Sequence, residues 1–120
     1  MSSQSPTPIE IVASLRGYRF NYSCEDDLQK ALASVLTRCS IPFQREYVLS
    51  PKDRLDFLVG TTAIEVKIQG SLVEVVRQVQ RYLQSPKIES VIVVTTRNTH
   101  RRMPETMNGK TIHVLYLPPL

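Results

Sequence analysis

The chain has 120 residues, of which 42% are hydrophobic and 22% charged, a composition typical of one soluble globular domain. It has no apolar run near the roughly 20 residues that span a bilayer and no signal-peptide pattern at its start, so we expect a cytoplasmic protein without a membrane partner. The formal net charge of +4 is compatible with a nucleic-acid partner, but many unrelated small proteins are equally basic.

A short amphipathic helix is predicted near the start of the chain, over residues 8–16. The Thr-Pro-Ile-Glu sequence at positions 7–10 forms a capping box with proline at the first helical position. We assign residues 1–16 as an N-terminal extension that carries this helix, and residues 17–120 as the main domain.

A longer helix is predicted to follow and to end near Cys39, before an Ile-Pro pair. Its apolar residues recur at helical spacing, namely Leu28, Ala31, Leu32, Val35, Leu36 and Cys39. The Ser-Cys-Glu-Asp sequence at positions 23–26 precedes them as a second capping box. This boundary places Glu25 in the first turn of the helix.

The pattern then changes to a period of two, which predicts three strands in a meander. The strands cover residues 43–49, 54–59 and 62–69, and the last two are joined at Gly60-Thr61. A third capping box at positions 71–74 opens a helix that runs to about Gln84.

The last third of the chain contains two further predicted strands. Residues 91–94 are apolar at every position, as expected of a central strand that is covered on both faces. Residues 97–110 are polar and ambiguous, with room for a helical turn and then a loop, and a final strand covers residues 111–117. The order of elements predicts an α/β fold with a mixed central sheet flanked by helices.

The turn at Gly60-Thr61 sets a register for the hairpin of residues 54–69. With a two-residue turn, Phe57 opposes Ile64 and Leu55 opposes Val66. We expect these four apolar side chains to lie together on the core face.

On the other face of the hairpin, Asp56 opposes Glu65 and Arg54 opposes Lys67. Two carboxylates about 5 Å apart repel each other unless a cation lies between them, and a hard ion such as Mg²⁺ takes carboxylate oxygens as ligands. Lys67 points the same way as Glu65 and could orient a water or neutralise charge on a phosphate. The alternative is a half-solvated sheet whose outer face is simply polar.

These residues resemble the motif of the PD-(D/E)xK nuclease superfamily, which has the restriction-endonuclease-like fold. Asp56 and the Glu-Val-Lys triplet at 65–67 match the motif, although Leu55 stands where the motif has proline. The αβββαβ core of the family matches the order of elements predicted from residue 23 to residue 95. The segment 78–82 has the form Q-x-x-x-Y, which resembles the motif after E-x-K in RecB-type and lambda-exonuclease-type members. We therefore expect a small stand-alone member of the superfamily with a RecB-like motif.

The resemblance implies a deoxyribonuclease that hydrolyses phosphodiester bonds of DNA with Mg²⁺ or Mn²⁺. The metal ligands would be Asp56, Glu65, Glu25 and the backbone carbonyl of Val66, and Lys67 would act on the attacking water. The residues that would contact the substrate are Gln78, Tyr82, Arg77 and Arg81.

Several biological settings remain compatible with this prediction. Small members of the superfamily include phage and mobile-element nucleases and Holliday-junction resolvases, so a structure-specific endonuclease is one alternative. A second is a non-catalytic module on a nuclease fold that binds nucleic acid or a protein. The small size favours a homodimer or a subunit of a larger nucleic-acid-processing complex.

Two other groups of residues are candidates for nucleic-acid contacts. Tyr18, Phe20 and Tyr22 alternate beside Arg19 and could stack on bases, although packing of the first helix against the core is the favoured interpretation. A polar segment gathers basic residues that could position phosphates, namely Arg97, His100, Arg101, Arg102 and Lys110. We expect no catalytic role for His100 or His113, because neither has a nucleophile or metal-ligand partner at useful spacing.

Overall fold

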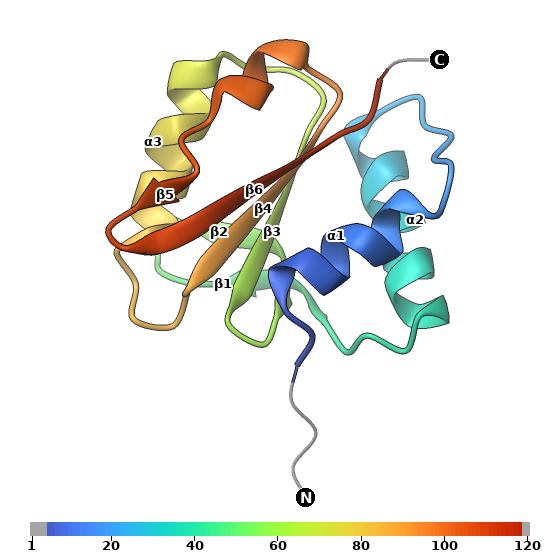
Figure 1. Cartoon of the computed structure of the whole chain (residues 1–120), viewed down its shortest axis with the longest axis horizontal. Helices are drawn as coiled ribbons and strands as arrows, with labels where there is room; N and C mark the ends of the chain where they lie inside the picture. The colour runs from blue at the N-terminus through green and yellow to red at the C-terminus, as the bar shows by residue number, and fades with distance from the viewer. Residues whose placement is uncertain (1–4, 119–120) are drawn as a thin grey trace, which may run out of the picture.

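A computed structural model of the chain describes residues 5–118 and consists of a six-stranded sheet with helices on both faces (Figure 1). The helices are α1 (Pro8–Arg16), α2 (Glu25–Arg38), α3 (Leu72–Leu83) and the short 3-10 helix η1 (Asn98–Arg102). The strands are β1 (Gln44–Val48), β2 (Arg54–Val59), β3 (Thr62–Lys67), β4 (Ser90–Thr95), β5 (Thr106–Met107) and β6 (Lys110–Tyr116).

The sheet is mixed, as predicted, with the strand order β1-β2-β3-β4-β6-β5. Strands β1, β2 and β3 form an antiparallel meander, β3, β4 and β6 run parallel, and β5 returns antiparallel to β6. Helix α3 is the crossover between the parallel strands β3 and β4, so it lies against the sheet directly after the strand that carries Glu65 and Lys67. Among residues 5–118, no helix combines the length and apolar composition needed to cross a bilayer.

The helix starts show which of the predicted capping boxes form. The boxes that open α1 and α3 are both present, with reciprocal side-chain and backbone hydrogen bonds between Thr7 and Glu10 and between Ser71 and Glu74. The predicted box at the start of α2 is wrong. Cys24 is the N-cap of α2 and makes no side-chain cap, and the backbone N–H of Ser23 donates to Oδ2 of Asp27 at 3.2 Å.

Two apolar clusters fill the space on either side of the sheet. Helices α1 and α2 cover one face, and α3 covers the other. Strand β4 contributes to both, because Ile92 and Val94 lie in the first cluster and Val91 and Val93 in the second. Helix α1, predicted to belong to an N-terminal extension, is part of the core.

The predicted hairpin register is confirmed for three residue pairs and then ends. Val59 pairs with Thr62, Leu58 with Ala63 and Phe57 with Ile64, and no further pair joins β2 to β3 within the described residues. Beyond this point the two strands separate. Leu55 lies in the cluster beneath α3, whereas Phe57, Ile64 and Val66 lie in the cluster beneath α1 and α2. The prediction that Leu55 shares a face with the other three is therefore wrong.

A distortion in β1 accompanies this change of face. The pairing of β1 with β2 passes from Arg45–Phe57 to Tyr47–Leu55, and Glu46, which would face Asp56, has a positive φ of 53°. A residue in the left-handed region breaks the alternation of an extended strand and re-aims the side chains of the pair. Asp56 consequently has no backbone ladder partner on either side among the described residues.

The polar segment that is ambiguous in the sequence contains η1 and a further hairpin, formed by β5 and β6, in place of a loop. Strands β5 and β6 are joined at Asn108 and Gly109, whose φ values are 56° and 71°. Two consecutive positive φ values are the signature of a type I′ turn, for which Asn-Gly is the preferred sequence.

The strain at Glu46 predicts a stabilising substitution. Glycine adopts positive φ without the steric cost that Glu46 incurs, so Glu46→Gly is expected to raise the free energy of unfolding by up to about 1 kcal/mol. Gln44→Gly, on the same exposed strand, has no such strain to relieve and is expected to lower it by about 0.5–1 kcal/mol. Urea unfolding of both variants measures the difference. A loss of stability in both would show that Glu46 is not strained.

Candidate active site

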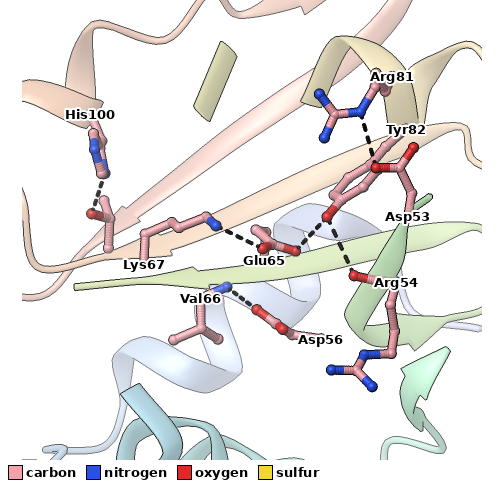
Figure 2. A network of polar contacts seen from close by, with 10 residues as sticks. Asp53, Arg54, Asp56, Glu65, Val66, Lys67, Arg81, Tyr82 and His100 are labelled. Carbon is pink, nitrogen blue, oxygen red and sulfur yellow. Dashed lines mark hydrogen bonds and ion pairs between the residues drawn. The ribbon is translucent and has the colours of Figure 1, made fainter. Parts of the chain in front are cut away.

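The candidate site lies where β2 and β3 separate. Oδ2 of Asp56 accepts a hydrogen bond from the backbone N–H of Val66 at 2.8 Å (Figure 2). The carboxylate therefore takes the place of the backbone carbonyl that a continuing ladder would supply. Asp56 therefore lies near Glu65 because its side chain turns into this gap. The prediction that Asp56 and Glu65 oppose each other across the two strands is wrong.

Glu65 is the most buried acidic group of the site, with 3% of its surface exposed. Its Oε1 accepts a hydrogen bond from the hydroxyl of Tyr82 at 3.0 Å, and its Oε2 forms an ion pair with Nζ of Lys67 at 3.1 Å (Figure 2). Burial raises the pKa of Glu65 from its ordinary 4.5 to about 7, and the nearby charge of Asp56 adds to this rise. Lys67 and Tyr82 oppose it, because both stabilise the charged form.

Tyr82 occupies a different place from the one the sequence suggests. It was predicted to contact the substrate, but it is fully buried, and its hydroxyl lies 3.0 Å from Glu65 and 3.4 Å from the carbonyl oxygen of Arg54. Burial, followed by the charge of Glu65, raises the pKa of the Tyr82 hydroxyl, so it stays protonated and donates. Tyr82 is therefore placed to hold the carboxylate of Glu65 in one orientation.

Two further carboxyl groups have raised pKa values around Lys67. Burial raises the pKa of Asp56, against the hydrogen bond from Val66 and the positive charge of Lys67. Burial also raises the pKa of Glu25, in the first turn of α2; Lys67 opposes this rise and Asp56 adds to it. The three acids come from α2, β2 and β3, and the structure brings them near one lysine.

A cleft of about 510 Å³ opens beside these groups, between the start of α2 and α3. Five of the predicted site residues line it, namely Glu25, Lys67, Arg77, Gln78 and Arg81, whereas Asp56 and Glu65 are not among its lining residues. The Nε of Arg81 is engaged 3.0 Å from Oδ1 of Asp53 in the turn before β2. The predicted substrate-contacting residues therefore gather at one opening, except for Tyr82.

Two oxygen atoms face the gap between β2 and β3, one from the side chain of Asp56 and one from the backbone of Val66. Within residues 5–118, Oδ1 of Asp56 has no hydrogen-bond partner, and no buried side-chain oxygen or nitrogen is left unpaired, so this oxygen reaches solvent. Because the N–H and C=O of one strand residue point to the same side, the carbonyl of Val66 also points toward the gap. No group of three or more His, Cys, Asp or Glu side chains in the described part of the chain is spaced to hold a metal ion.

His100 connects the cleft to η1, a contact that sequence reasoning missed. The fully buried ring lies 2.8 Å from the carbonyl of Gly70 through Nε2 and 2.7 Å from Oγ1 of Thr95 through Nδ1. A carbonyl only accepts, so Nε2 carries the hydrogen and Nδ1 accepts from Thr95. Gly70 lines the cleft. His100 therefore links the edge of the cleft to Thr95 at the end of β4 through its two hydrogen bonds. No motif in the sequence signals this bond, which joins residues thirty positions apart.

Comparison of the chain with protein-family models, with curated proteins and with solved structures gives no match. The resemblance to the PD-(D/E)xK superfamily stays a prediction, and so do the restriction-endonuclease-like core and the RecB-like assignment.

The raised pKa of Glu65 predicts how stability depends on pH without divalent ions. The folded chain holds this proton more tightly than the unfolded chain, so its contribution is fully present below about pH 4.5 and is lost as the pH rises through about 7. The free energy of unfolding is expected to fall by on the order of 3 kcal/mol across this window.

Urea unfolding in EDTA between pH 4.5 and pH 8 measures this decline. Glu65→Gln, which cannot ionise, is expected to remove most of it, and Glu89→Gln, which removes an exposed carboxylate, is expected to leave it unchanged. If the free energy of unfolding falls equally in the unmodified protein and in Glu65→Gln, the decline comes from groups other than Glu65.

Proposed function

We propose that this protein is a divalent-metal-dependent nuclease that hydrolyses phosphodiester bonds of DNA at the gap between β2 and β3. The observation that supports this most is the burial of Glu65 beside Asp56, with Lys67 in contact, at the edge of a cleft lined by Arg77 and Gln78. A carboxylate that is merely part of a polar sheet face would be solvated, and Glu65 is not.

The electrostatics of the three acids favour a cation ligand. Burying a carboxylate near a second one is costly, and proteins retain such pairs where they hold a cation or share a proton. Glu25, Asp56 and Glu65 all have raised pKa values, and only Lys67 among the nearby cations forms an ion pair with one of them in the described chain. The positive charges of Arg45 and Arg54 also favour the charged form of Asp56, whereas Lys67 is the one cation that does so for Glu25 and Glu65 in the described chain.

The oxygens available fit a hard divalent ion such as Mg²⁺ or Mn²⁺, which prefers carboxylate and carbonyl ligands. Asp56, Glu65 and the carbonyl of Val66 would hold the ion, and Glu25 would assist from the start of α2. When bound, such an ion lowers the pKa of a coordinated water and stabilises negative charge on a phosphate.

Lys67 has two roles in this proposal. In the structure its ammonium neutralises Oε2 of Glu65, an oxygen that a cation would also use. Occupation of the site would release Lys67 toward the cleft that it already lines. There its charge could stabilise the phosphate or orient the attacking water.

The substrate would be held by side chains of α3. Arg77 and Gln78 line the cleft, and an arginine provides hydrogen bonds and charge to a phosphate without reading sequence. Tyr82 would keep Glu65 in place from beneath α3. Tyr82 is therefore a positioning residue in this proposal and not a substrate contact.

Metal binding can be tested separately from cleavage. At pH 8, Mg²⁺ or Mn²⁺ at ten times its Kd is expected to raise the melting temperature by about 5 °C. Asp56→Asn keeps an oxygen that can accept from Val66 but lacks the charge, so it is expected to lose this shift. Lys67→Met removes the competing ammonium and keeps the apolar stem, so it is expected to retain or increase it. Equal shifts in all three proteins would place the ion elsewhere.

Cleavage tests the complete proposal. The chain with Mg²⁺ or Mn²⁺ is expected to cut DNA, and Asp56→Asn and Lys67→Met are each expected to be at least about 100-fold slower. Linear, supercoiled and four-way-junction DNA as substrates separate a general nuclease from a resolvase-like enzyme. Binding of DNA without cleavage, unaffected by either variant, would indicate the non-catalytic module instead.

A further inference from the structure

A groove runs along the free edge of β6, on the opposite side of η1 from the candidate active site. Strand β5 pairs with β6 at Lys110 and Thr111, and the backbone N–H of Ile112 still donates to the carbonyl of Glu105 at 2.9 Å. Past that point a cavity of about 540 Å³ lies over residues 114–117, and a second of about 200 Å³ adjoins it. Tyr18 and Leu117 line both cavities, so the two form one continuous surface, which we call the edge groove.

The edge groove is positively charged. Arg16 and Arg101 line its larger cavity and Arg19 lines the smaller, and no acidic residue lines either one. A third cavity of about 620 Å³ shares Arg16, Arg101 and Val114 with the larger one and extends away from the groove toward Glu105 and Thr106. None of the three arginines forms an ion pair with a carboxylate in the described part of the chain. Three exposed guanidinium groups without acidic partners favour a polyanionic ligand.

Aromatic rings lie among these charges. Tyr18, Tyr22 and Tyr116 line the edge groove and are half-buried. The guanidinium of Arg101 lies 5.2 Å from the ring centre of Tyr116, and that of Arg38 lies 5.9 Å from that of Tyr18. Only Phe20 of the alternating aromatic residues is buried in the core. All three residues pack against the core, as the favoured interpretation predicts, but Tyr18 and Tyr22 remain partly exposed.

The edge groove and the candidate active site lie at the same end of the parallel strands. Lys67 of β3 is in register with Thr95 of β4, and Thr95 is in register with Tyr116 of β6. Two strand spacings separate the backbones of Lys67 and Tyr116 by about 10 Å. Helix η1 joins the two places, because His100 bonds Gly70 at the cleft and the next residue, Arg101, covers Tyr116.

We propose that the edge groove binds an unpaired strand of nucleic acid that extends from the candidate active site. Arginines would contact its phosphates, and the tyrosine rings would stack on its bases, as in sequence-tolerant single-strand binding. This inference rests on the proposed function only in taking nucleic acid as the substrate.

Two other ligands could occupy an open strand edge, namely a second copy of this chain and an acidic peptide, and the residues of the groove favour neither. A second copy that paired its β6 with this one would bring two arginine-lined grooves together, which is repulsive. An acidic peptide would match the arginines but would leave the tyrosine rings without a stacking partner.

The test measures binding of a fluorescent 12-nucleotide oligothymidine by anisotropy in EDTA, where cleavage is absent. The double variant Arg16→Ala/Arg101→Ala is expected to bind at least tenfold more weakly. Its dependence of log K on log salt is expected to be shallower by about 1.4, or about 0.7 for each arginine that no longer binds a phosphate. The double variant Lys52→Ala/Lys87→Ala removes the same charge outside the groove and is expected to stay within twofold of the unmodified chain.

Stacking is separated from packing by two tyrosine variants. Tyr18→Phe/Tyr116→Phe keeps the rings and is expected to bind like the unmodified chain, whereas Tyr18→Leu/Tyr116→Leu keeps apolar bulk and is expected to lose at least tenfold. Melting temperatures confirm that each variant is folded. A 12-base-pair duplex is expected to bind more weakly than the single strand, and oligouridine is expected to compete with oligothymidine.

Unchanged affinity in the arginine and leucine variants would overturn the inference, as would full competition by oligoglutamate. A dimer that these arginine substitutions strengthen would show that the edge pairs with a second copy instead. Because binding is measured without metal, the outcome is independent of cleavage. If the groove variants weaken binding but the protein cuts no DNA, the proposed nuclease activity is refuted and this inference stands. If the protein cuts DNA but the groove variants bind the oligonucleotide as tightly as the unmodified chain, only this inference is refuted.

Discussion

Glu65 is held between the hydroxyl of Tyr82 and the ammonium of Lys67, with 3% of its surface exposed, and a buried carboxylate persists only if its neighbours stabilise it. Those neighbours come from β3 itself and from the crossover helix α3. The hydrogen bond from Tyr82 ties the helix to the strand, and Lys67 supplies the compensating charge. The negative charge of Asp56 works against both, because it raises the pKa of Glu65 further.

The separation of β2 from β3 creates the room for this arrangement. A continuous ladder would satisfy the N–H of Val66 with a backbone carbonyl, and the Asp56 carboxylate would then project from a sheet face. Instead Asp56 turns into the gap and accepts that N–H, while Glu46 in β1 adopts a left-handed conformation at the matching position. Strain in one edge strand thus coincides with the opening that the candidate chemistry needs.

Local patterns predicted most of the elements, because capping boxes and turns act over a few residues. The Gly60-Thr61 turn set three pairs of the hairpin correctly, and it failed where the side chain of Asp56 replaced a backbone partner, a tertiary event that no alternating pattern reveals. The β5–β6 hairpin was within reach of the sequence, since Asn108-Gly109 is a strong turn signal. The place of Tyr82 was not, because helical spacing indicates a face but not how deeply α3 is buried.

The ionisation of Glu65 tests the central claim most directly. The side-chain carboxyl carbon of this residue can be followed by ¹³C NMR through a pH titration, first in EDTA and then with saturating Mg²⁺. The account predicts a midpoint near 7 without the ion and a clear fall in that midpoint when Mg²⁺ is present, because a bound cation favours the charged form. A midpoint near 4.5 that Mg²⁺ leaves unchanged would contradict it.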